Sequence, residues 1–481
     1  MMINIVWFKR DLRLTDHMPL KTAIDSGRKT LLLFIIEPIL VASEHYSNRH
    51  WKFMMECLKD MQDLIAPHET EICILEGEII ELFSALQREY GTFELYSHLE
   101  IGIDITYKRD IEVAKWMKNQ GFQWREFHQN AITRGRKNRN NWNKEWELFM
   151  NEPLQNVDLS LLKSVTLSSH LKTSFKQTLV IQKESEAMQI GGRIRAEKLL
   201  KSFLNKRYLN YSRSISKPTE SRSYCSRLSP YIAWGALSIR EITQQTAQRM
   251  RELPKNRSLQ NYMSRLHWHC HFIQKFESSP EIEFINQNPA FNVIRNKLNT
   301  KHLEAWCSGK TGVPLIDACM RCVNETGYIN FRMRAMVVSF WTHNLQQPWQ
   351  PAADHLSKQF LDFEPGIHFP QIQMQAGTVG YHTLRIYNPI KQAEDHDPDA
   401  VFIKKWVPEL ANLPAVFARE PWQMTPIESL MDNFHLGEDY PFPICDIEES
   451  ARLAKDEIYR IKKSTEARMF ARQISKVHVN K

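Results

Sequence analysis

The sequence changes its periodicity along its length, and this change constrains the possible folds more than any other feature. In the first 130 residues, short apolar runs alternate with stretches in which apolar residues recur three and four positions apart. Five runs are predicted to be strands: Ile3–Phe8, Thr30–Ile36, Glu71–Leu75, Phe93–His98 and Gln123–His128. The clearest helical patterns between them are Asn48–Ile65, Glu78–Tyr90 and Thr106–Asn119. Strands that alternate with helices imply right-handed crossovers, and therefore a parallel, doubly wound α/β sheet.

From Gly191 onward almost every segment has the periodicity of a helix. The predicted helices include Ile194–Asn205, Ile239–Arg251, Gln260–Phe276, Leu315–Thr326 and Met333–Leu345. Residues 131–190 lack a clear period and are interpreted as an interdomain linker. We therefore expect an α/β doubly wound parallel-sheet domain at 1–130, a linker at 131–190 and an all-α domain at 191–481.

Two basic segments are interpreted as solvated surface. Thr133–Asn141 is basic and rich in turn residues, and its charge pattern favours a solvated linker over contact with nucleic-acid phosphates. Glu448–Arg472 has the pattern of one basic amphipathic helix, which we expect to dock by its apolar face.

Composition narrows the class of protein. The 481 residues carry a formal net charge of +8, which favours a polyanionic partner and permits nucleic-acid binding without demonstrating it. The eight cysteines lack the spacing of a disulfide framework, which fits a reducing compartment. The first residues have no signal-peptide pattern, and no apolar run approaches the length of a membrane span. We expect a soluble cytoplasmic protein that does not enter the membrane.

The most specific stretch is Cys225–Ser238, which reads C-S-R-L-S-P-Y-I-A-W-G-A-L-S. Ser226 and Ser229 lie beside Pro230, a residue type that can open a helix at its first turn. Hydroxyls and free backbone N–H groups at a helix start suit a diphosphate, although most serine-rich helix starts only cap the helix. No G-x-G-x-x-G follows the first strand, so an NAD-type site is not predicted.

Five motifs in order carry a resemblance to a known family. Trp7–Asp16 is similar to an opening W-F-R-R-D-L-R-L-x-D, and Cys225–Ser238 is similar to a diphosphate loop T-S-R-L-S-P-Y-L, with Cys225 where threonine is usual. The other matches are to G-x-T-G-x-P-x-x-D-A, R-I-F-N-P and D-P-D-G…W-V-P-E-L, at Gly309–Ala318, Arg385–Pro389, and Asp397–Asp399 with Trp406–Leu410. Over residues 1–130 and 191–425 the chain therefore resembles the photolyase/cryptochrome family.

The resemblance implies that the region from about Gly191 to Leu410 holds FAD, and that the α/β domain can hold an antenna chromophore of folate or deazaflavin type. In photolyases, light-excited reduced FAD passes an electron to a flipped-out pyrimidine dimer, which splits and returns the electron. Residue by residue, the resemblance assigns the cofactor contacts to Tyr211, Ser226, Arg227, Leu228, Ser229, Tyr262, His269, Asn330, Arg334, Asp362, Glu364 and His368.

Three charged residues are central to the implied flavin site. Arg334 matches the arginine near the isoalloxazine ring and is expected to pair with Asp362, the first carboxylate of a D-x-D motif. Glu364 stands in for the second carboxylate. A buried arginine needs such a partner because an unpaired buried charge is costly. The alternative interpretation is an ordinary structural ion pair.

Several cofactor positions depart from the family pattern. His368 aligns with the residue that faces flavin N5, and an imidazole there is expected to exchange a proton in the physiological range and to tune the flavin redox state. Tyr262 and His269 replace the usual tryptophan and arginine. Phe331 stands where an asparagine normally reaches adenine and substrate, and the adjacent Asn330 is expected to compensate.

The implied substrate site departs further. Trp268 matches one of the two tryptophans that sandwich the dimer, and Met374 takes the place of the other. A methionine can still stack because its thioether is polarizable and adaptable. Arg265 replaces a glutamate that binds the dimer in one photolyase branch, so the hydrogen bonding differs from the well-known cyclobutane-dimer site.

The implied electron-transfer chain of tryptophans is broken. Trp349 occupies its middle position, but Ile372 and Asn296 replace the proximal and distal indoles. Trp341 or Trp306 offers another route, or packs as a core residue. The candidate catalytic residues are Trp268, Met374, Trp349 and His368.

No metal site is predicted. His267 and His271 lie one helical turn apart, but no third or fourth ligand has a suitable spacing. Cys319 and Cys322 form a C-x-x-C pair, but the companion cysteines of an iron–sulfur cluster do not form a recognisable set, which favours a core role.

The leading hypothesis is a blue-light-driven, FAD-dependent photolyase that repairs pyrimidine dimers in UV-damaged DNA and acts as a monomer. The alternative is a cryptochrome-like blue-light photoreceptor without repair activity, which Arg265, Met374 and the altered electron chain favour. A third reading is a flavoprotein whose light chemistry serves neither purpose.

Overall fold

Five parallel strands form the predicted sheet. The computed structural model describes residues 2–479. The strands, in the spatial order β3-β2-β1-β4-β5, are Ile72–Glu76, Thr30–Ile36, Ile3–Phe8, Phe93–His98 and Gln123–Phe127. Every neighbouring pair is parallel, which confirms the doubly wound α/β fold. The direction of winding reverses between β1 and β4, and crevices at such a reversal are where doubly wound folds bind ligands.

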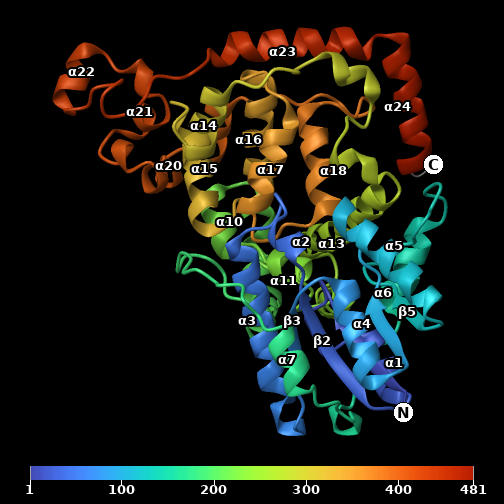
Figure 1. Ribbon diagram of the computed structural model, residues 1–481. Helices are drawn as coiled ribbons and strands as arrows, with labels where there is room; N and C mark the ends of the chain where they lie inside the picture. The colour runs from blue at the N-terminus through green and yellow to red at the C-terminus, as the bar shows by residue number, and fades with distance from the viewer. Residues whose placement is uncertain (1, 480–481) are drawn as a thin grey trace.

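The central strands β2, β1 and β4 are buried throughout because both faces of the sheet are covered. Val6 and Phe8 of β1 join one core cluster, whereas Ile5 and Trp7 join the other. The helices of this part are α1 (Met18–Asp25), α2 (Pro38–Val41), α3 (Asn48–Ile65), α4 (Ile79–Tyr90) and α5 (Asp104–Asn119). The first core lies under α1 and α3 and continues into the helical part, and the second lies under α4 and α5. One continuous core therefore joins the sheet to the helices above it (Figure 1).

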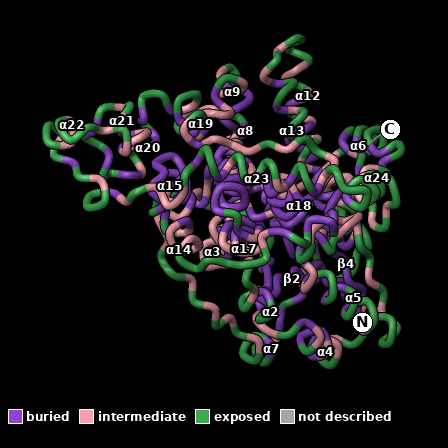
Figure 2. Tube along the Cα trace, turned by 90° about the horizontal axis from the view of Figure 1, so that it is seen from above, coloured by how far each residue is buried: buried purple, intermediate pink, exposed green. Residues whose placement is uncertain are grey.

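The rest of the chain is helical, as predicted. Its helices are α8 (Arg193–Ser202), α9 (Tyr208–Ser214), α10 (Pro218–Tyr224), α11 (Ser229–Ala233), α12 (Ile239–Glu252), α13 (Arg257–Glu277), α14 (Thr300–Ser308), α15 (Pro314–Thr326), α16 (Phe331–Ser339), α17 (Trp349–Gln359), α18 (Pro365–Ala376), α19 (Pro389–His396), α20 (Val401–Trp406), α21 (Ala415–Arg419) and α22 (Pro426–Met431). α13 packs along α18, whose chain is buried over most of its length, whereas α22 projects at one end and is exposed (Figure 2). The expected helices that began at Ile194 and Met333 each end in a π-helical turn, at Phe203–Arg207 and Phe340–Asn344.

Residues 131–190 connect the two parts but are more ordered than the sequence suggested. They contain α6 (Trp142–Asn151) and α7 (Ser169–Ser174), and Trp142, Trp146 and Met150 of α6 are buried. The interpretation of the basic run as solvated linker is wrong for Arg139, which is only 2% exposed. Trp142, Trp146 and Met150 recur at helical spacing, but the basic turn residues just before them hid the pattern of the helix.

The C-terminal segment is two helices rather than the single helix that was predicted. α23 (Ile447–Lys462) runs along the top of the helical part, and α24 (Thr465–His478) turns down its side (Figure 1). The helix is interrupted at Ser464, because the Ser464 hydroxyl accepts a hydrogen bond from the Ala467 N–H and so caps the start of a new helix. Across residues 2–479, no helix combines the length and apolar character needed to cross a membrane.

Candidate functional site

The serine-rich loop joins α10 to α11 and has the backbone of an anion-binding turn. Arg227 has a positive φ of 61°, and Leu228 follows it in the right-handed helical region. Such an alternation turns successive N–H groups toward one side, where they can face an anion. Leu228 anchors the loop in the core, while Ser226 and Ser229 stay half-buried.

The side chain of Arg227 points away from this concavity. Its guanidinium lies 3.6 Å from the ring centroid of Tyr328 and donates a hydrogen bond of 2.8 Å to the Gln189 side chain. Arg227 is therefore tied to its own neighbours, and we expect its contribution to an anion site to come from its backbone.

Two tyrosines and a phenylalanine pack beside the loop. Tyr262 of α13 lies 4.5 Å from Phe203 and 5.7 Å from Tyr211, measured between ring centroids. Tyr262 is buried, and its hydroxyl has no hydrogen-bond partner. Burial raises the pKa of Tyr262, and the nearby Ser226 hydroxyl acts in the opposite direction. The phenol is thus a neutral, unsatisfied polar group next to the loop.

Arg334 and Asp362 form the ion pair that the motif predicted, with Nη2 and Oδ2 2.9 Å apart. The Arg334 guanidinium also lies 3.9 Å from the Phe360 ring centroid. Burial acts to raise the pKa of Asp362, but the charge and hydrogen bond of Arg334 outweigh it, and the pKa is lowered. The other carboxylate oxygen, Oδ1, is buried without a partner.

Glu364 does not join this pair. Its partner is Arg10, which comes from the loop after β1, with Nη2 and Oε2 3.4 Å apart. Arg10 also donates hydrogen bonds to the carbonyls of Phe363 and Ala233, and its guanidinium lies 4.5 Å from the Trp234 ring. The expected three-residue cluster is therefore two separate pairs, one of which joins the sheet to the helices.

Arg10 is the residue that sequence reasoning missed at this site. It lies inside the Trp7–Asp16 motif, but that motif was used only to establish the resemblance. Its Nη1 is buried without a hydrogen-bond partner, and its charge contributes to lowering the pKa of His269 to about 4, after burial. Arg10 and His269 of α13 therefore face the same buried region.

Asn330 is not free to replace the family's asparagine. Its Oδ1 accepts a hydrogen bond from the Met333 N–H at 3.0 Å, which caps α16, and its Nδ2 donates to the Ile215 carbonyl at 3.2 Å. The neighbouring Phe331 is exposed. The expected compensation by Asn330 is therefore not supported by its contacts.

His368 behaves differently from the expectation. Its Nε2 lies 2.9 Å from the Ala353 carbonyl, to which it must donate, so Nδ1 carries the lone pair. Burial lowers the pKa of His368 to about 3, against a small opposing effect of the Ala353 carbonyl. The imidazole is therefore neutral throughout the physiological range, and proton exchange there was a wrong expectation. It can still accept a hydrogen bond at Nδ1.

The substrate candidates lie on α13 and α18. Trp268 is 46% exposed and lies 5.6 Å from Phe272 and 5.7 Å from His271, between ring centroids. Met374 is half-buried on α18, and Arg265 is exposed one turn before Trp268. α13 therefore carries Trp268 at the surface and the next residue, His269, toward the buried Arg10 region.

Trp349 is the one tryptophan at the three positions of the implied electron-transfer chain, because Ile372 and Asn296 occupy the other two. It is buried at the start of α17, and its Nε1 donates a hydrogen bond of 2.8 Å to Asn286. Trp349 and Asn296 line a cavity of about 220 Å³. The other two candidates, Trp306 and Trp341, are fully buried with ring centroids 5.3 Å apart.

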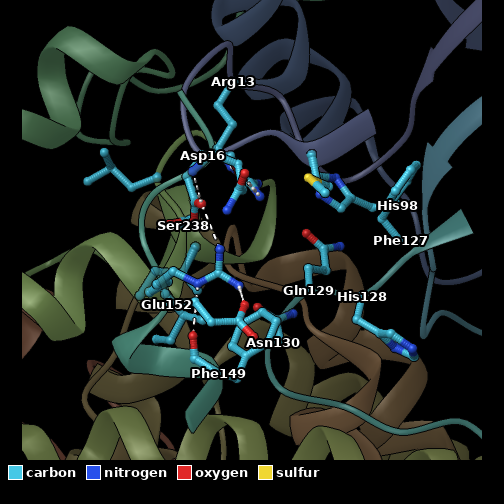
Figure 3. A pocket seen from close by; sticks show the side chains of 16 residues that line it. Arg13, Asp16, His98, Phe127, His128, Gln129, Asn130, Phe149, Glu152 and Ser238 are labelled. Atoms are coloured by element: carbon cyan, nitrogen blue, oxygen red, sulfur yellow. Dashed lines mark hydrogen bonds and ion pairs between the residues drawn. The ribbon is translucent and has the colours of Figure 1, made fainter. Parts of the chain in front are cut away.

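A second cavity, of about 230 Å³, lies where β1, β4 and β5 end against α6 and α12 (Figure 3). Part of its polar lining is internally paired, because Arg240 binds both Asp16, at 2.9 Å, and Glu152, at 3.1 Å. Ligand pockets usually exceed about 300 Å³. This cavity is therefore a polar seam between the sheet and the helices rather than a pocket for a large chromophore.

Asp11, His17 and His98 form a buried cluster beside this seam. The Asp11 carboxylate accepts hydrogen bonds from His17 Nε2 at 2.9 Å and His98 Nδ1 at 2.7 Å. His17 Nδ1 accepts a hydrogen bond from the Leu20 N–H, so its proton must be on Nε2. Because Nε2 of His17 is protonated, it has no free lone pair with which to bind a metal ion beside Asp11. The cluster is a hydrogen-bonded structural unit.

The histidine and cysteine pairs weighed as metal ligands in the sequence make contacts that are typical of structural residues. His267 bonds to Asn143 at 3.1 Å and packs against Trp142 and Trp146. Cys319 and Cys322 are fully buried thiols in the core of α15.

The buried polar atoms fit a bound FAD. Among the residues that the structure describes, the Tyr262 hydroxyl, Asp362 Oδ1 and Arg10 Nη1 are all buried without hydrogen-bond partners, and they come from three distant parts of the chain. Unsatisfied buried polar groups are costly, so such a set indicates a polar ligand. A flavin nucleotide has both donors and acceptors for these groups.

Comparison with known proteins agrees with this reading. Residues 262–460 match the family model for the FAD binding domain of DNA photolyase, and residues 4–149 match that for DNA photolyase. The fold and these matches define a flavoprotein whose helical part is an FAD-binding domain. The chain belongs to the photolyase/cryptochrome family.

The relatives include both branches of that family. The chain is 27% identical to a cryptochrome DASH of Gloeobacter violaceus, with 95% of each chain covered. It is 25% identical to a deoxyribodipyrimidine photo-lyase of Alkalihalophilus pseudofirmus, covering 92% of this chain and 95% of that protein. The crystal structure of the Synechocystis cryptochrome superimposes with a TM-score of 0.84 at 22% identity, covering 95% of this chain and 99% of that one.

Proposed function

We propose that this protein is a blue-light-driven, FAD-dependent DNA photolyase that repairs UV-induced pyrimidine dimers. One observation carries the proposal. α13 exposes Trp268 at the surface, where an indole can stack on a base, while Tyr262 and His269 of the same helix face the buried interior that we propose holds the flavin. The basic net charge of +8 is consistent with a DNA partner. We further propose that the protein acts as a monomer.

Bound FAD in its reduced state would supply, on excitation by light, the electron that splits the dimer. The 225–229 loop would bind the diphosphate through its backbone N–H groups, with Ser226 and Ser229 beside it. Arg334, Asp362 and Arg10 would orient the flavin, and His368 would accept a hydrogen bond at Nδ1. Trp268 and Met374 would contact the extruded dimer.

Two further assignments are part of the proposal. The first is the division of the chain into an α/β domain at 1–130, a connecting segment at 131–190 that packs against both parts, and a helical domain at 191–481. The sheet domain is proposed to hold an antenna chromophore of folate or deazaflavin type. The seam in Figure 3 is an unsuitable place for it, because that cavity of about 230 Å³ is small and partly paired internally.

The decisive experiment illuminates the reduced holoprotein with DNA that contains cyclobutane dimers or (6-4) lesions and then assays the restored bases. We expect repair of one lesion class in the light and none in the dark. Failure to repair either lesion, with a flavin that still responds to light, would reject the photolyase assignment.

Trp268→Ala is expected to weaken binding to lesion-containing DNA by about 1–3 kcal/mol, the usual contribution of one stacked base. This corresponds to roughly 5- to 150-fold in Kd at fixed salt. The measurement is a fluorescence anisotropy titration with damaged and undamaged duplexes. Phe442→Ala removes another exposed aromatic, in the segment after α22, and should leave Kd unchanged. Equal affinity of the Trp268→Ala and wild-type proteins would exclude stacking on Trp268.

A cryptochrome-like photoreceptor is the second candidate, and the altered electron chain favours it. Ile372 is buried where an indole would be needed, and Asn296 is exposed beside the Trp349 cavity. A flavin that responds to light but has no lesion to repair would fit these changes.

Trp349→Phe is expected to slow light-driven reduction of the bound flavin, because the substitution removes the remaining indole of that chain. The measurement is the decay of flavin absorbance near 450 nm under blue light with an external reductant. Trp422→Phe, at a site outside the proposed chain, serves as the matched control. An unchanged rate for Trp349→Phe would place that residue off the path and direct attention to the Trp306–Trp341 pair.

A further inference from the structure

Four separate segments bring basic side chains together at the side of the helical part. We call Arg139, Lys275, His271, His382 and His478 the cationic cluster. Its positive charge belongs to Arg139 and Lys275, because burial lowers the pKa of His271 and His478 to about 3 and that of His382 to about 4. They come from the turn before α6, from α13, from the loop between α18 and α19, and from α24. Arg139, Lys275 and His478 are each only 2% exposed, whereas His382 is exposed at the edge. None of them belongs to the flavin site described above.

Direct contacts hold these segments in place. Arg139 Nη2 donates a hydrogen bond of 2.7 Å to the His271 carbonyl, and the Lys275 ammonium lies 5.6 Å from the Tyr381 ring centroid. His478 Nε2 lies 3.1 Å from the Ser279 hydroxyl, just after α13. The loop is fixed from the other side, because Lys462 of α23 donates to the His382 carbonyl at 2.7 Å.

The cluster has no counter-charge within residues 2–479. No carboxylate lies within 4.0 Å of Arg139 or Lys275 there. Glu277, the nearest acidic residue along α13, is engaged by Arg134 at 3.7 Å and by the Gly135 N–H. Arg139 and Lys275 lie over the rings of Trp142 and Tyr381 but have no carboxylate partner among the described residues. Two such buried charges are strongly unfavourable, so a native fold that keeps both groups charged is expected to recruit an anion.

Free donors in the cluster indicate the kind of anion. Within residues 2–479, Arg139 Nε and Nη1 and His478 Nδ1 are buried without hydrogen-bond partners. The Lys275 ammonium makes no hydrogen bond to any described residue and offers up to three donors. Burial and the Arg139 charge lower the pKa of Lys275 to about 7, and burial lowers that of Arg139 to about 10, as expected for cations that lack a counter-ion. Several free donors with two positive charges suit a tetrahedral oxyanion.

We propose that the cationic cluster binds a small oxyanion, such as inorganic phosphate or the phosphate of a mononucleotide, with Arg139 and Lys275 as its charged ligands. The 2% exposure of both side chains favours a small anion over the backbone of a DNA duplex. The bound anion would also link α24 to α13 and to the segment before α6. The proposal does not rest on the proposed repair activity, although His271 of the cluster packs against Trp268.

The test is calorimetric titration of the full-length FAD-loaded protein with inorganic phosphate in chloride buffer at constant ionic strength. We expect one saturable site in the wild type and at least a tenfold weaker affinity in Lys275→Met, because one of two charged ligands is lost. Lys183→Met carries the same charge change on an exposed side chain and should bind phosphate like the wild type. Arg139→Gln gives a second, independent variant, and retained flavin absorbance confirms that each variant is folded.

A thermal shift adds a readout that simple loss of structure would not produce. Phosphate should raise the Tm of the wild type, since it binds only the folded state, and leave Lys275→Met unchanged. Without phosphate, Lys275→Met should melt no lower than the wild type, because the substitution removes an unpaired buried charge. Competition with a mononucleotide and with an undamaged duplex then distinguishes a free anion from a DNA phosphate. No saturable phosphate binding by the wild type, or equal affinity in Lys275→Met, would overturn the proposal.

Discussion

Asp362→Ala is expected to weaken FAD retention strongly. The substitution leaves Arg334 without its ion-pair partner and removes Asp362 Oδ1, the buried acceptor that we assign to the cofactor. Breaking a buried pair costs about 3–5 kcal/mol, and the 24% exposure of the Arg334 side chain places this case nearer 2–3 kcal/mol. That range corresponds to roughly 30- to 150-fold weaker FAD binding. The measurement is the ratio of flavin to protein absorbance after gel filtration, followed by titration of the apoprotein with FAD.

A matched control separates this effect from the general loss of an ion pair. Glu409→Ala breaks the pair with Arg321, whose atoms are 2.8 Å apart, at a position outside the proposed flavin site. This variant should stay fully yellow. If Asp362→Ala retains FAD as the wild type does, the pair is structural and its assignment to the cofactor is wrong.

Arg10→Met is expected to destabilise the whole fold and release FAD. Arg10 is the ion-pair partner of Glu364, and its guanidinium joins the loop after β1 to Phe363 and to Trp234 in the helical part. Burial already raises the pKa of Glu364, and the Arg10 charge is the main effect that opposes this rise. Without Arg10, the unpaired Glu364 should cost about 3–5 kcal/mol of the free energy of unfolding. Urea unfolding followed by circular dichroism and flavin fluorescence measures both effects.

The partner substitution makes this prediction specific. In Arg10→Met/Glu364→Gln the unpaired charge is gone, so the double variant should be more stable than Arg10→Met alone. The four proteins form a double-mutant cycle whose coupling free energy reports the pair. Additive losses would show that Arg10 acts through Trp234 and the backbone carbonyls rather than through Glu364.

Local patterns were sufficient for most of the secondary structure. The predicted bounds of α3 and of β1, β2 and β4 agree with the structure residue for residue, because period and apolar content are properties of short windows. β5 and α4 differ by a single terminal residue, and β3 is shifted by one residue toward the C-terminus. Failures occurred where a local signal was masked or interrupted, as in α6 behind its basic turn and at the Ser464 cap between α23 and α24.

The fold class, the family and the Arg334–Asp362 pair follow from the residues alone, since each depends on periodicity or on a motif with fixed spacing. Which groups share a charge environment depends instead on the folded arrangement of distant segments. Arg10 and Glu364 are 354 positions apart, and they meet because the sheet docks under the helices. The same docking buries Arg139 beside Lys275 and fixes the proton of His368 on Nε2. Burial and pairing depend on non-local packing, and no window of the sequence contains both partners.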